Sequence, residues 1–398
     1  TLSADAARSA QKRENPYTLP QMRHGIYQKN LKNVRSHLTA DIFRYMMTMV
    51  FDIASLFYLL LFGKVMEAMF SFKINTECKL PPIGYGTYKS VGGDCTAIFR
   101  EALRQGYRYI DTASFYGNEV EIGTAIKESG LKRTDLLLAS KVWKTEMGYD
   151  ETLRAAEHSL SRLGTDYLDL YLIHWPRPDL QMSEWEKLDR ETWRAMERLL
   201  DEGVLRAIGV SNFLPHHIEN LAVTGNVAPA VNQIEFHPGY PQLETVAYCH
   251  TQNILPQAWS PLGRTRVLAH PLIQTLSENY GKTPAQICLN YALMHGVMPL
   301  PKASSPERMR ENLDAASFSM EAEDVAVLDE METVGWSGLH PDKERAFSVC
   351  VKPPLLRSMK IAGSAQGNAV KTGVQGKPDF VGWTPHCTSP VLHCISGR

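Results

Sequence analysis

The stretch Tyr107–Ala125, Y-R-Y-I-D-T-A-S-F-Y-G-N-E-V-E-I-G-T-A, holds one complete unit of strand, loop and helix. A short apolar run ends at Ile110, and apolar residues return at helical spacing from Ile122 onward. The loop between them carries Asp111 and Tyr116. Because the same kind of unit recurs along the chain, this stretch indicates the fold of the whole protein.

From about Leu80 onward the chain repeats a short apolar run, a polar loop and a helix. The predicted strands are Ile83–Tyr88, Tyr107–Ile110, Leu136–Ser140, Leu168–Ile173, Arg206–Val210, Ala230–Gln233, Ile254–Ala258 and Val297–Leu300. The predicted helices are Thr96–Gln105, Val120–Ser129, Glu151–Leu163, Thr192–Glu202, Pro215–Val223, Leu243–Thr251 and Pro284–His295. Several of these helices are followed by a glycine, which accepts the positive φ of a helix end: Gly106, Gly130, Gly164, Gly203 and Gly296.

The chain has eight predicted strands, and their apolar residues run on continuously rather than alternating with polar ones. Eight such strands alternating with helices predict a closed parallel (β/α)8 TIM barrel. A doubly wound sheet is the alternative. A dinucleotide site in such a sheet uses a glycine-rich loop, but no G-x-G-x-x-G follows a strand, no P-loop is present, and Gly84-Tyr85-Gly86 lacks the third glycine. In a barrel, the chemistry lies at the carboxyl ends of the strands.

The composition divides the chain into three parts. Its 398 residues are 44% hydrophobic and 21% charged, as in a globular protein with a large core. Residues 1–44 and 348–398 each carry a formal charge of +5, and 45–347 carry -11. We therefore expect a basic, then apolar N-terminal extension over 1–74 outside the fold, a barrel over 75–347 and a disordered basic tail over 348–398, so that both extensions are poorly ordered. The acidic middle argues against nucleic-acid binding.

The mostly apolar stretch 45–63 is near the length of a membrane span. Asp52 near its centre and the basic segment before it argue against an anchor, so membrane contact is expected at most through this stretch and is not favoured. An alternative is that the native chain starts at Met69.

The cysteines are scattered, with no C-x-x-C pair, which indicates a reducing compartment and no metal site. A cytoplasmic location is therefore expected.

Polar side chains stand at the ends of consecutive predicted strands. Asp111 and Tyr116 follow the second strand, Lys141 ends the third in L-L-L-A-S-K, and His174 ends the fourth in L-Y-L-I-H. Taken singly, Lys141 reads as a rim residue and His174 as a satisfied core histidine. Together they stand where the barrel alone needs no polar group, and Asp111 is an available partner for a buried Lys141. The sequence therefore predicts a catalytic cluster at this end.

These residues and several further motifs resemble the aldo-keto reductase family. The resemblance rests on D-T-A-x-x-Y-G-N-E from Asp111, S-K-V-W from Ser140, L-I-H-W-P from Leu172, I-G-V-S-N-F from Ile208, V-N-Q-I-E-F-H-P from Val231 and P-K-A-S-S-P-E-R-M-R-E-N from Pro301. It covers about Leu80 to Phe347. The short W-S-P-L-G-R segment and the G-L-H-P-D ending look most like bacterial-type members that reduce small dicarbonyls or keto-sugars.

The resemblance implies an NADP-dependent oxidoreductase that reduces aldehydes and ketones to alcohols. Tyr116 would donate the proton, and Lys141 as a cation would stabilise the anion that is left. Asp111 would keep Lys141 charged and in position. His174 would hydrogen-bond the carbonyl oxygen and orient it.

By the same resemblance, NADPH would lie across the barrel mouth. It would be held by Ser211, Asn212, Gln233, Trp259, Ser260, Leu262, Gly263, Lys302, Ser304, Arg308 and Asn312. Alone, Lys302 and Arg308 read as a solvated helix start, but two cations there suit a 2′-phosphate and favour NADPH over NADH.

The substrate, a small carbonyl compound, would contact Tyr88, Trp143, His174 and Trp175; taken alone, the three aromatic residues read as ordinary core or rim side chains. We expect a monomeric enzyme. A steroid-type ketone reductase and a non-catalytic, cofactor-binding regulatory subunit remain the alternatives.

Overall fold

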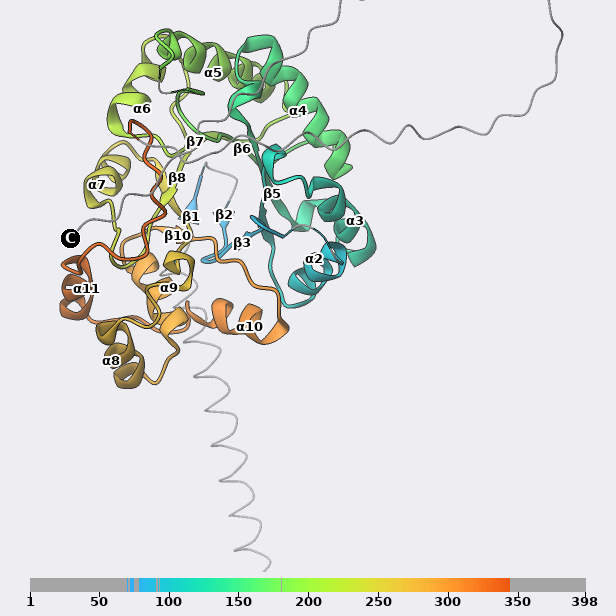
Figure 1. Cartoon of the computed structure of the whole chain (residues 1–398). Helices are drawn as coiled ribbons and strands as arrows, with labels where there is room; N and C mark the ends of the chain where they lie inside the picture. The colour runs from blue at the N-terminus through green and yellow to red at the C-terminus, as the bar shows by residue number, and fades with distance from the viewer. Residues whose placement is uncertain are drawn as a thin grey trace, which may run out of the picture. The chain divides into compact units, whose positions relative to one another are not determined.

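A computed structural model describes residues 70, 72–74, 79–90, 92, 94–179 and 181–343. Within them, eight parallel strands form one sheet in which each strand pairs with the next along the chain, from β3 to β10 (Figure 1). The strands are β3 (Tyr85–Gly86), β4 (Tyr109–Asp111), β5 (Leu137–Val142), β6 (Leu170–Ile173), β7 (Ile208–Ser211), β8 (Val231–Glu235), β9 (Leu255–Trp259) and β10 (Met298–Pro299). The predicted strands are confirmed, with ends that shift by at most two residues.

Two backbone hydrogen bonds close the sheet into a barrel. The Gly84 N–H donates to Pro299 O over 3.1 Å, and the Gly86 N–H donates to Pro301 O over 3.1 Å, which joins β3 to β10. A Cβ on Gly86 would lie 2.6 Å from Leu300 O, so only glycine allows this approach. The predicted barrel is confirmed, and a doubly wound sheet, which has two open edges, is excluded.

Helices cover the outside of the barrel (Figure 1). The helices are α2 (Cys95–Arg104), α3 (Glu119–Ser129), α4 (Tyr149–Leu163), α5 (Trp185–Asp201), α6 (Pro215–Ala222), α7 (Leu243–Thr251), α8 (Pro271–Tyr280), α9 (Pro284–Met294), α10 (Pro306–Asp314) and α11 (Ala322–Asp329). All the predicted helices are present, although α5 begins at Trp185 rather than at Thr192. Helices α8, α10 and α11 are outside the predicted ranges, although the interpretation of Lys302 and Arg308 as a helix start agrees with the position of α10. Proline at the first position of α8 and α10 was the available signal.

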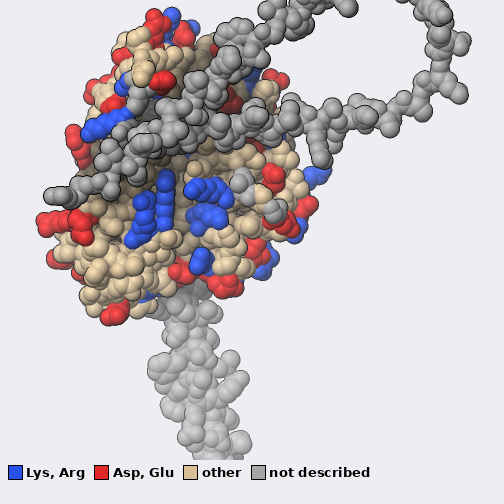
Figure 2. All heavy atoms as spheres, in the orientation of Figure 1, with Lys and Arg blue, Asp and Glu red and all other residues tan. Residues whose placement is uncertain are grey.

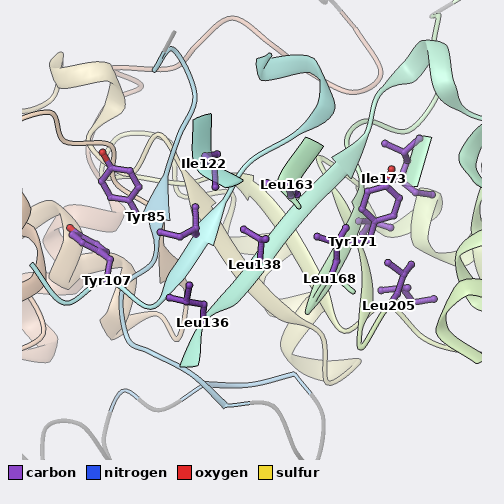
Figure 3. Packing of buried hydrophobic residues seen from close by; sticks show 14 of the residues in the cluster. Tyr85, Tyr107, Ile122, Leu136, Leu138, Leu163, Leu168, Tyr171, Ile173 and Leu205 are labelled. Carbon is purple, nitrogen blue, oxygen red and sulfur yellow. The ribbon is translucent and has the colours of Figure 1, made fainter. Parts of the chain in front are cut away.

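The main core lies between the strands and this ring of helices (Figure 3). Outward-facing strand residues such as Leu138 and Tyr171 are fully buried there, together with Ile122 of α3 and Leu163 of α4. Burying such side chains contributes about 25 cal/mol per Å² of apolar surface. On α4, Ala156 and Leu163 are buried, and Leu153 and Leu160 are half-buried against the same core.

A short hairpin closes the barrel end that is opposite to the carboxyl ends of the strands. Its strands β1 (Phe72–Lys73) and β2 (Lys79–Leu80) pair antiparallel. Ile74 and Leu80 join a buried cluster inside the barrel with residues near the strand starts, such as Tyr109 and Leu170. Phe70 is also buried, in the main core. The folded part therefore reaches Phe70, which is earlier than the expected boundary at residue 75.

Several predictions fall on residues that the structure does not describe. They are the prediction that both extensions are poorly ordered and the prediction about membrane contact through 45–63. In the part of the chain that is described, no helix has both the length and the apolar character needed to cross a bilayer.

Candidate active site

Asp111, Tyr116, Lys141 and His174 come together at the carboxyl ends of neighbouring strands. Asp111 ends β4, Lys141 lies in β5, and His174 follows β6, while Tyr116 ends the short 3₁₀ helix η1 (Ser114–Tyr116). The Tyr116 and His174 ring centroids are 5.5 Å apart, and Lys141 Nζ is 5.1 Å from the Tyr116 ring centroid. The chain thus places an ion pair below a phenol and an imidazole.

The ion pair between Asp111 and Lys141 lies inside the barrel. Lys141 Nζ donates to Asp111 Oδ1 over 2.5 Å and to Thr112 O over 2.8 Å, and Lys141 is 0% exposed. Burial raises the pKa of the Asp111 carboxyl and lowers the pKa of the Lys141 ammonium, while their mutual attraction opposes both shifts. The amide of Gln233 also donates to Asp111 Oδ1, over 3.1 Å. Each charge therefore depends on the other to stay ionised in this position.

Burial sets the resting protonation states of the two residues above the pair. It raises the pKa of the Tyr116 phenol well above its usual value, and the nearby Asp111 carboxylate adds to the effect. It lowers the pKa of His174 well below its usual value, and Lys141 lowers it further. At neutral pH, Tyr116 is therefore protonated and His174 is a neutral imidazole, so both can donate a hydrogen bond.

The backbone carbonyl of His174 is hydrogen-bonded, whereas one nitrogen of its ring has no such bond within the part of the chain that the structure describes. Its carbonyl oxygen accepts from Asn212 Nδ2 over 2.9 Å, which ties the end of β6 to the end of β7. Its buried Nδ1 has no hydrogen-bond partner among the described residues.

Aromatic side chains form the walls beside this cluster. The Tyr88 ring centroid is 5.0 Å from that of Tyr116, and Tyr88 is 42% exposed. Trp143 is buried and meets the His174 ring edge to face over 4.9 Å. Trp175 is also buried. The structure adds Phe115, which stacks on Trp143 with centroids 3.9 Å apart; its place beside Tyr116 in the sequence was the signal for it.

The residues expected at the nicotinamide end of a cofactor are linked to the ion pair. Trp259 Nε1 donates to Asn212 Oδ1 over 2.8 Å, and Ser211 Oγ donates to Gln233 O over 2.8 Å. Since Gln233 also donates to Asp111, a continuous path of hydrogen bonds joins β7 and β8 to β4 across the mouth.

The loop after β9 has an unusual backbone. Ser260, Gly263, Arg264 and Thr265 all have positive φ, at 48°, 51°, 54° and 69°. Left-handed residues other than glycine cost free energy and gather at binding sites. Leu262 lies within this turn, just before the 3₁₀ helix η4 (Gly263–Thr265), so the two predicted residues Leu262 and Gly263 share one tight loop.

The residues expected at the adenosine end lie just before α10 and along it. Lys302 Nζ donates to Ser304 Oγ over 2.5 Å, and both side chains are exposed. Arg308 is exposed in the first turn of the helix, and Asn312 is buried. Figure 2, in the orientation of Figure 1, shows Lys and Arg side chains grouped in the middle of the visible face and near the place of α10. This set of cations and donors suits the phosphate of a dinucleotide.

The segment after α11 supplies a further wall that the sequence analysis gave no role. Ser337 donates to Glu235 through its backbone N–H, over 2.9 Å, and through Oγ, over 2.6 Å. Leu339 and Pro341 then line a small cavity together with Asn212 and Trp259. The segment is thus attached to β8 beside the expected nicotinamide position.

Asp342 attaches the same segment to α6. His217 Nε2 lies 3.0 Å from its carboxylate, His216 Nε2 3.2 Å and Arg177 Nη1 3.4 Å. Burial alone would raise the pKa of Asp342, but these three neighbours hold it below its usual value.

Among the described residues, His216, His217 and Asp342 also bring three possible metal-ligand atoms within 4.8 Å of one another. However, the Leu214 N–H donates to His217 Nδ1 over 3.0 Å, which leaves the ring proton on Nε2, facing Asp342. A protonated nitrogen donates a hydrogen bond and does not ligate a metal, so we interpret the cluster as an anchor.

Comparison with known proteins places the chain among reductases. A family model described as "Aldo/keto reductase family" matches residues 82–333. The chain is 41% identical over 274 residues to the uncharacterized oxidoreductase YtbE of Bacillus subtilis, covering 68% of this chain and 95% of the relative. It is 42% identical over 272 residues to glyoxal reductase of the same bacterium, covering 68% and 96%.

Solved structures agree with this. A crystal structure of an aldo/keto reductase from Brucella melitensis shares 40% identity at a TM-score of 0.61, covering 65% of this chain and 98% of that one. A crystal structure of an aldo-keto reductase complexed with NADPH shares 33% identity at a TM-score of 0.62, covering 68% and 90%.

The buried ion pair predicts a pH-dependent loss of stability in Lys141→Met. Removing one partner leaves a buried carboxylate without its cation, which costs about 3–5 kcal/mol. The folded-state pKa of Asp111, already raised, rises further in this variant. The folded variant then binds a proton that the unfolded chain releases, so the loss should be smaller at about pH 5 than at about pH 8.

Urea unfolding of the parent and the variant at both pH values measures this effect. Lys127→Met on the exposed face of α3 is the control, and it should change the free energy of unfolding by less than about 0.5 kcal/mol at either pH. A Lys141→Met variant as stable as this control would contradict the description of the pair.

Proposed function

The chain belongs to the aldo/keto reductase family, and from this membership we propose that it reduces small dicarbonyls or keto-sugars with NADPH, using Tyr116 as the proton donor. Members of this family are NAD(P)-dependent oxidoreductases that act on carbonyl groups. The observation that carries the proposal is the buried Asp111–Lys141 pair below a protonated Tyr116 and a neutral His174. We also expect the enzyme to act as a monomer in the cytoplasm.

The donor set at the mouth fits the proposed cofactor. Lys302 and Arg308 offer exposed cations for a phosphate, Trp259 offers a ring for stacking, and Asn212 offers an amide. The NADPH-bound relative supports the choice of cofactor. When bound, the nicotinamide supplies hydride to the carbonyl carbon.

The protein's own groups would handle the carbonyl oxygen. His174 would donate a hydrogen bond to this oxygen and orient it, and the Tyr116 hydroxyl would give it a proton. The phenolate left behind lies above Lys141, whose ammonium stabilises the negative charge because an opposite charge within about 6 Å favours the ionised form. Asp111 would keep Lys141 charged and fix its position.

The surroundings of the cluster favour a small substrate. The stacked Phe115 and Trp143 rings lie next to His174, and the Tyr88 ring lies next to Tyr116. Only residues 260–270 separate β9 from α8, so no long insertion is available there to cover a large ligand. The similarity to a bacterial glyoxal reductase supports the same substrate class.

A substrate comparison tests this function. We expect methylglyoxal-like dicarbonyls and small aromatic aldehydes to show a higher kcat/KM than any ketosteroid, because a steroid would find too little apolar wall to bury its surface at about 25 cal/mol per Å². The loss of NADPH absorbance follows each reaction. A clear preference for the steroid would favour the steroid-type alternative, and no turnover of any carbonyl would favour the regulatory subunit.

Tyr116→Phe should abolish turnover while leaving NADPH binding nearly unchanged. The variant loses only the hydroxyl, which acts on the substrate, so we expect a fall of at least about 100-fold in kcat. Fluorescence titration measures NADPH affinity in the same preparation. Tyr248→Phe removes a hydroxyl from α7, which lies on the outside of the barrel, and is the control. Turnover of the Tyr116 variant within a few-fold of the parent would assign the proton to another group.

Arg308→Ala should weaken NADPH much more than NADH. A charge-assisted hydrogen bond to phosphate contributes about 1.5–3 kcal/mol, so we expect about a 10-fold to 100-fold rise in the Kd of NADPH alone. Arg310→Ala, which removes an exposed cation from the same helix, is the matched control. Equal weakening of both cofactors by Arg308→Ala would place its side chain away from the 2′-phosphate.

A further inference from the structure

One carboxylate links the two loops that carry the proton donor and the aromatic wall. Glu146 ends the 3₁₀ helix η3 (Lys144–Glu146), in the loop between β5 and α4. Its Oε2 accepts a hydrogen bond from Ser114 Oγ over 2.6 Å and another from the Trp143 N–H over 3.0 Å. Ser114 opens η1, the turn that ends in Tyr116. A single oxygen atom therefore joins the β4–α3 loop to the β5–α4 loop.

The link is supported from both sides. Ser114 Oγ also lies 3.1 Å from Lys141 O, but a hydroxyl has one proton, and the shorter bond to a carboxylate takes it. The Glu146 N–H donates to Trp143 O over 2.8 Å, and Thr152 Oγ1 donates to Glu146 O over 3.3 Å. These bonds fix the backbone of Glu146, so its carboxylate can leave only by a side-chain rotation that breaks both hydrogen bonds at Oε2.

The groups on either side of the link are those that face the substrate. Phe115 follows Ser114 directly and stacks on Trp143, with an angle of 16° between the two rings. Trp143 in turn meets the His174 ring at 74°. Both members of the stack are thus fixed through Glu146, one through the preceding residue and one through its own N–H.

We propose that Glu146 is a positioning residue for the reaction proposed above, on which this inference rests. Its carboxylate holds the Tyr116 turn and the Phe115–Trp143 stack in one arrangement and thereby sets the position of the proton donor and the width of the opening. Glu146 itself does not touch the substrate. Releasing the link should move Tyr116 relative to a bound carbonyl, and a shift of about 1 Å in a reacting group can cost about 100-fold in rate.

The experiment compares Glu146→Ala, Glu146→Gln, Ser114→Ala and the double variant Ser114→Ala/Glu146→Ala in the full chain. Glu146→Ala should lower kcat for a small dicarbonyl by about 10-fold to 100-fold, with little change in the Kd of NADPH. Glu146→Gln should stay within about threefold of the parent, because the amide oxygen accepts the same two hydrogen bonds. Glu157→Ala, an exposed acid on α4, is the matched control and should leave kcat unchanged.

Two comparisons separate this role from a general loss of stability. Ser114→Ala should lower kcat by about threefold to tenfold, and the double variant should be no slower than Glu146→Ala, since both changes break the same link. The opening should also widen, so Glu146→Ala should lose less kcat/KM with a bulky aromatic aldehyde than with the small dicarbonyl.

Three results would overturn the proposal: Glu146→Ala with kcat within threefold of the parent, losses that multiply in the double variant, or Glu146→Gln as slow as Glu146→Ala. If Glu146→Ala does not fold, a Ser114→Ala variant with the kcat of the parent, or a Glu146→Gln variant that loses more than about threefold in kcat, would overturn the proposal instead.

A spectroscopic readout keeps this test separate from the proposed activity. The near-UV circular dichroism that is lost in Trp143→Phe reports the Phe115–Trp143 stack, and the same band should be lost in Glu146→Ala but kept in Glu146→Gln. An unchanged band in Glu146→Ala contradicts the positioning role even if the parent reduces no carbonyl. An inactive parent with the expected spectra would contradict the proposed function alone.

Discussion

Closure of the sheet between β3 and β10 is the constraint on which the site depends. The bonds from Gly84 and Gly86 to the chain around Pro299 and Pro301 leave no free edge and turn the strand ends toward a common centre. In an open sheet, the ends of β4 and β8 would point away from each other. In the closed one, the amide of Gln233 reaches the carboxylate of Asp111 across the mouth. The proposed catalytic cluster and the expected cofactor residues are neighbours only because the ring is complete.

The same closure makes the ionised groups costly. Lys141 has no exposed surface, so its charge is held by Asp111 and Thr112 instead of water. Burial also keeps Tyr116 protonated and His174 neutral at rest. Burial therefore keeps the proton on the phenol, while the pairing with Asp111 keeps a cation beneath it. The cost of removing these groups from water is part of the free energy of folding, so it does not arise again during the proposed reaction.

Much of the fold and the central cluster could be predicted from the sequence, because the strands are apolar and a lysine or histidine at the end of such a strand stands out. The role of Glu146 could not be predicted, because it depends on how two loops approach each other and leaves no periodic signal, and for Phe115 the sequence offers only its place beside Tyr116. The sequence pattern around Gly86 points only to an incomplete phosphate loop, although in the structure Gly86 allows close backbone contact where β3 meets β10. The hairpin near Ile74 could not be predicted, because strands of two residues each are too short to show a periodic pattern.

The segment from Gly335 to Lys343 shows how the barrel separates recognition from folding. It is held at Ser337 and Asp342 by polar bonds to β8 and α6, and Leu339 and Pro341 between these points face the cavity beside Trp259. None of its side chains belongs to the main core. Substitutions between the two attachments should therefore cost the barrel little stability, so the wall beside Trp259 can change its shape and polarity while the scaffold that carries it stays the same.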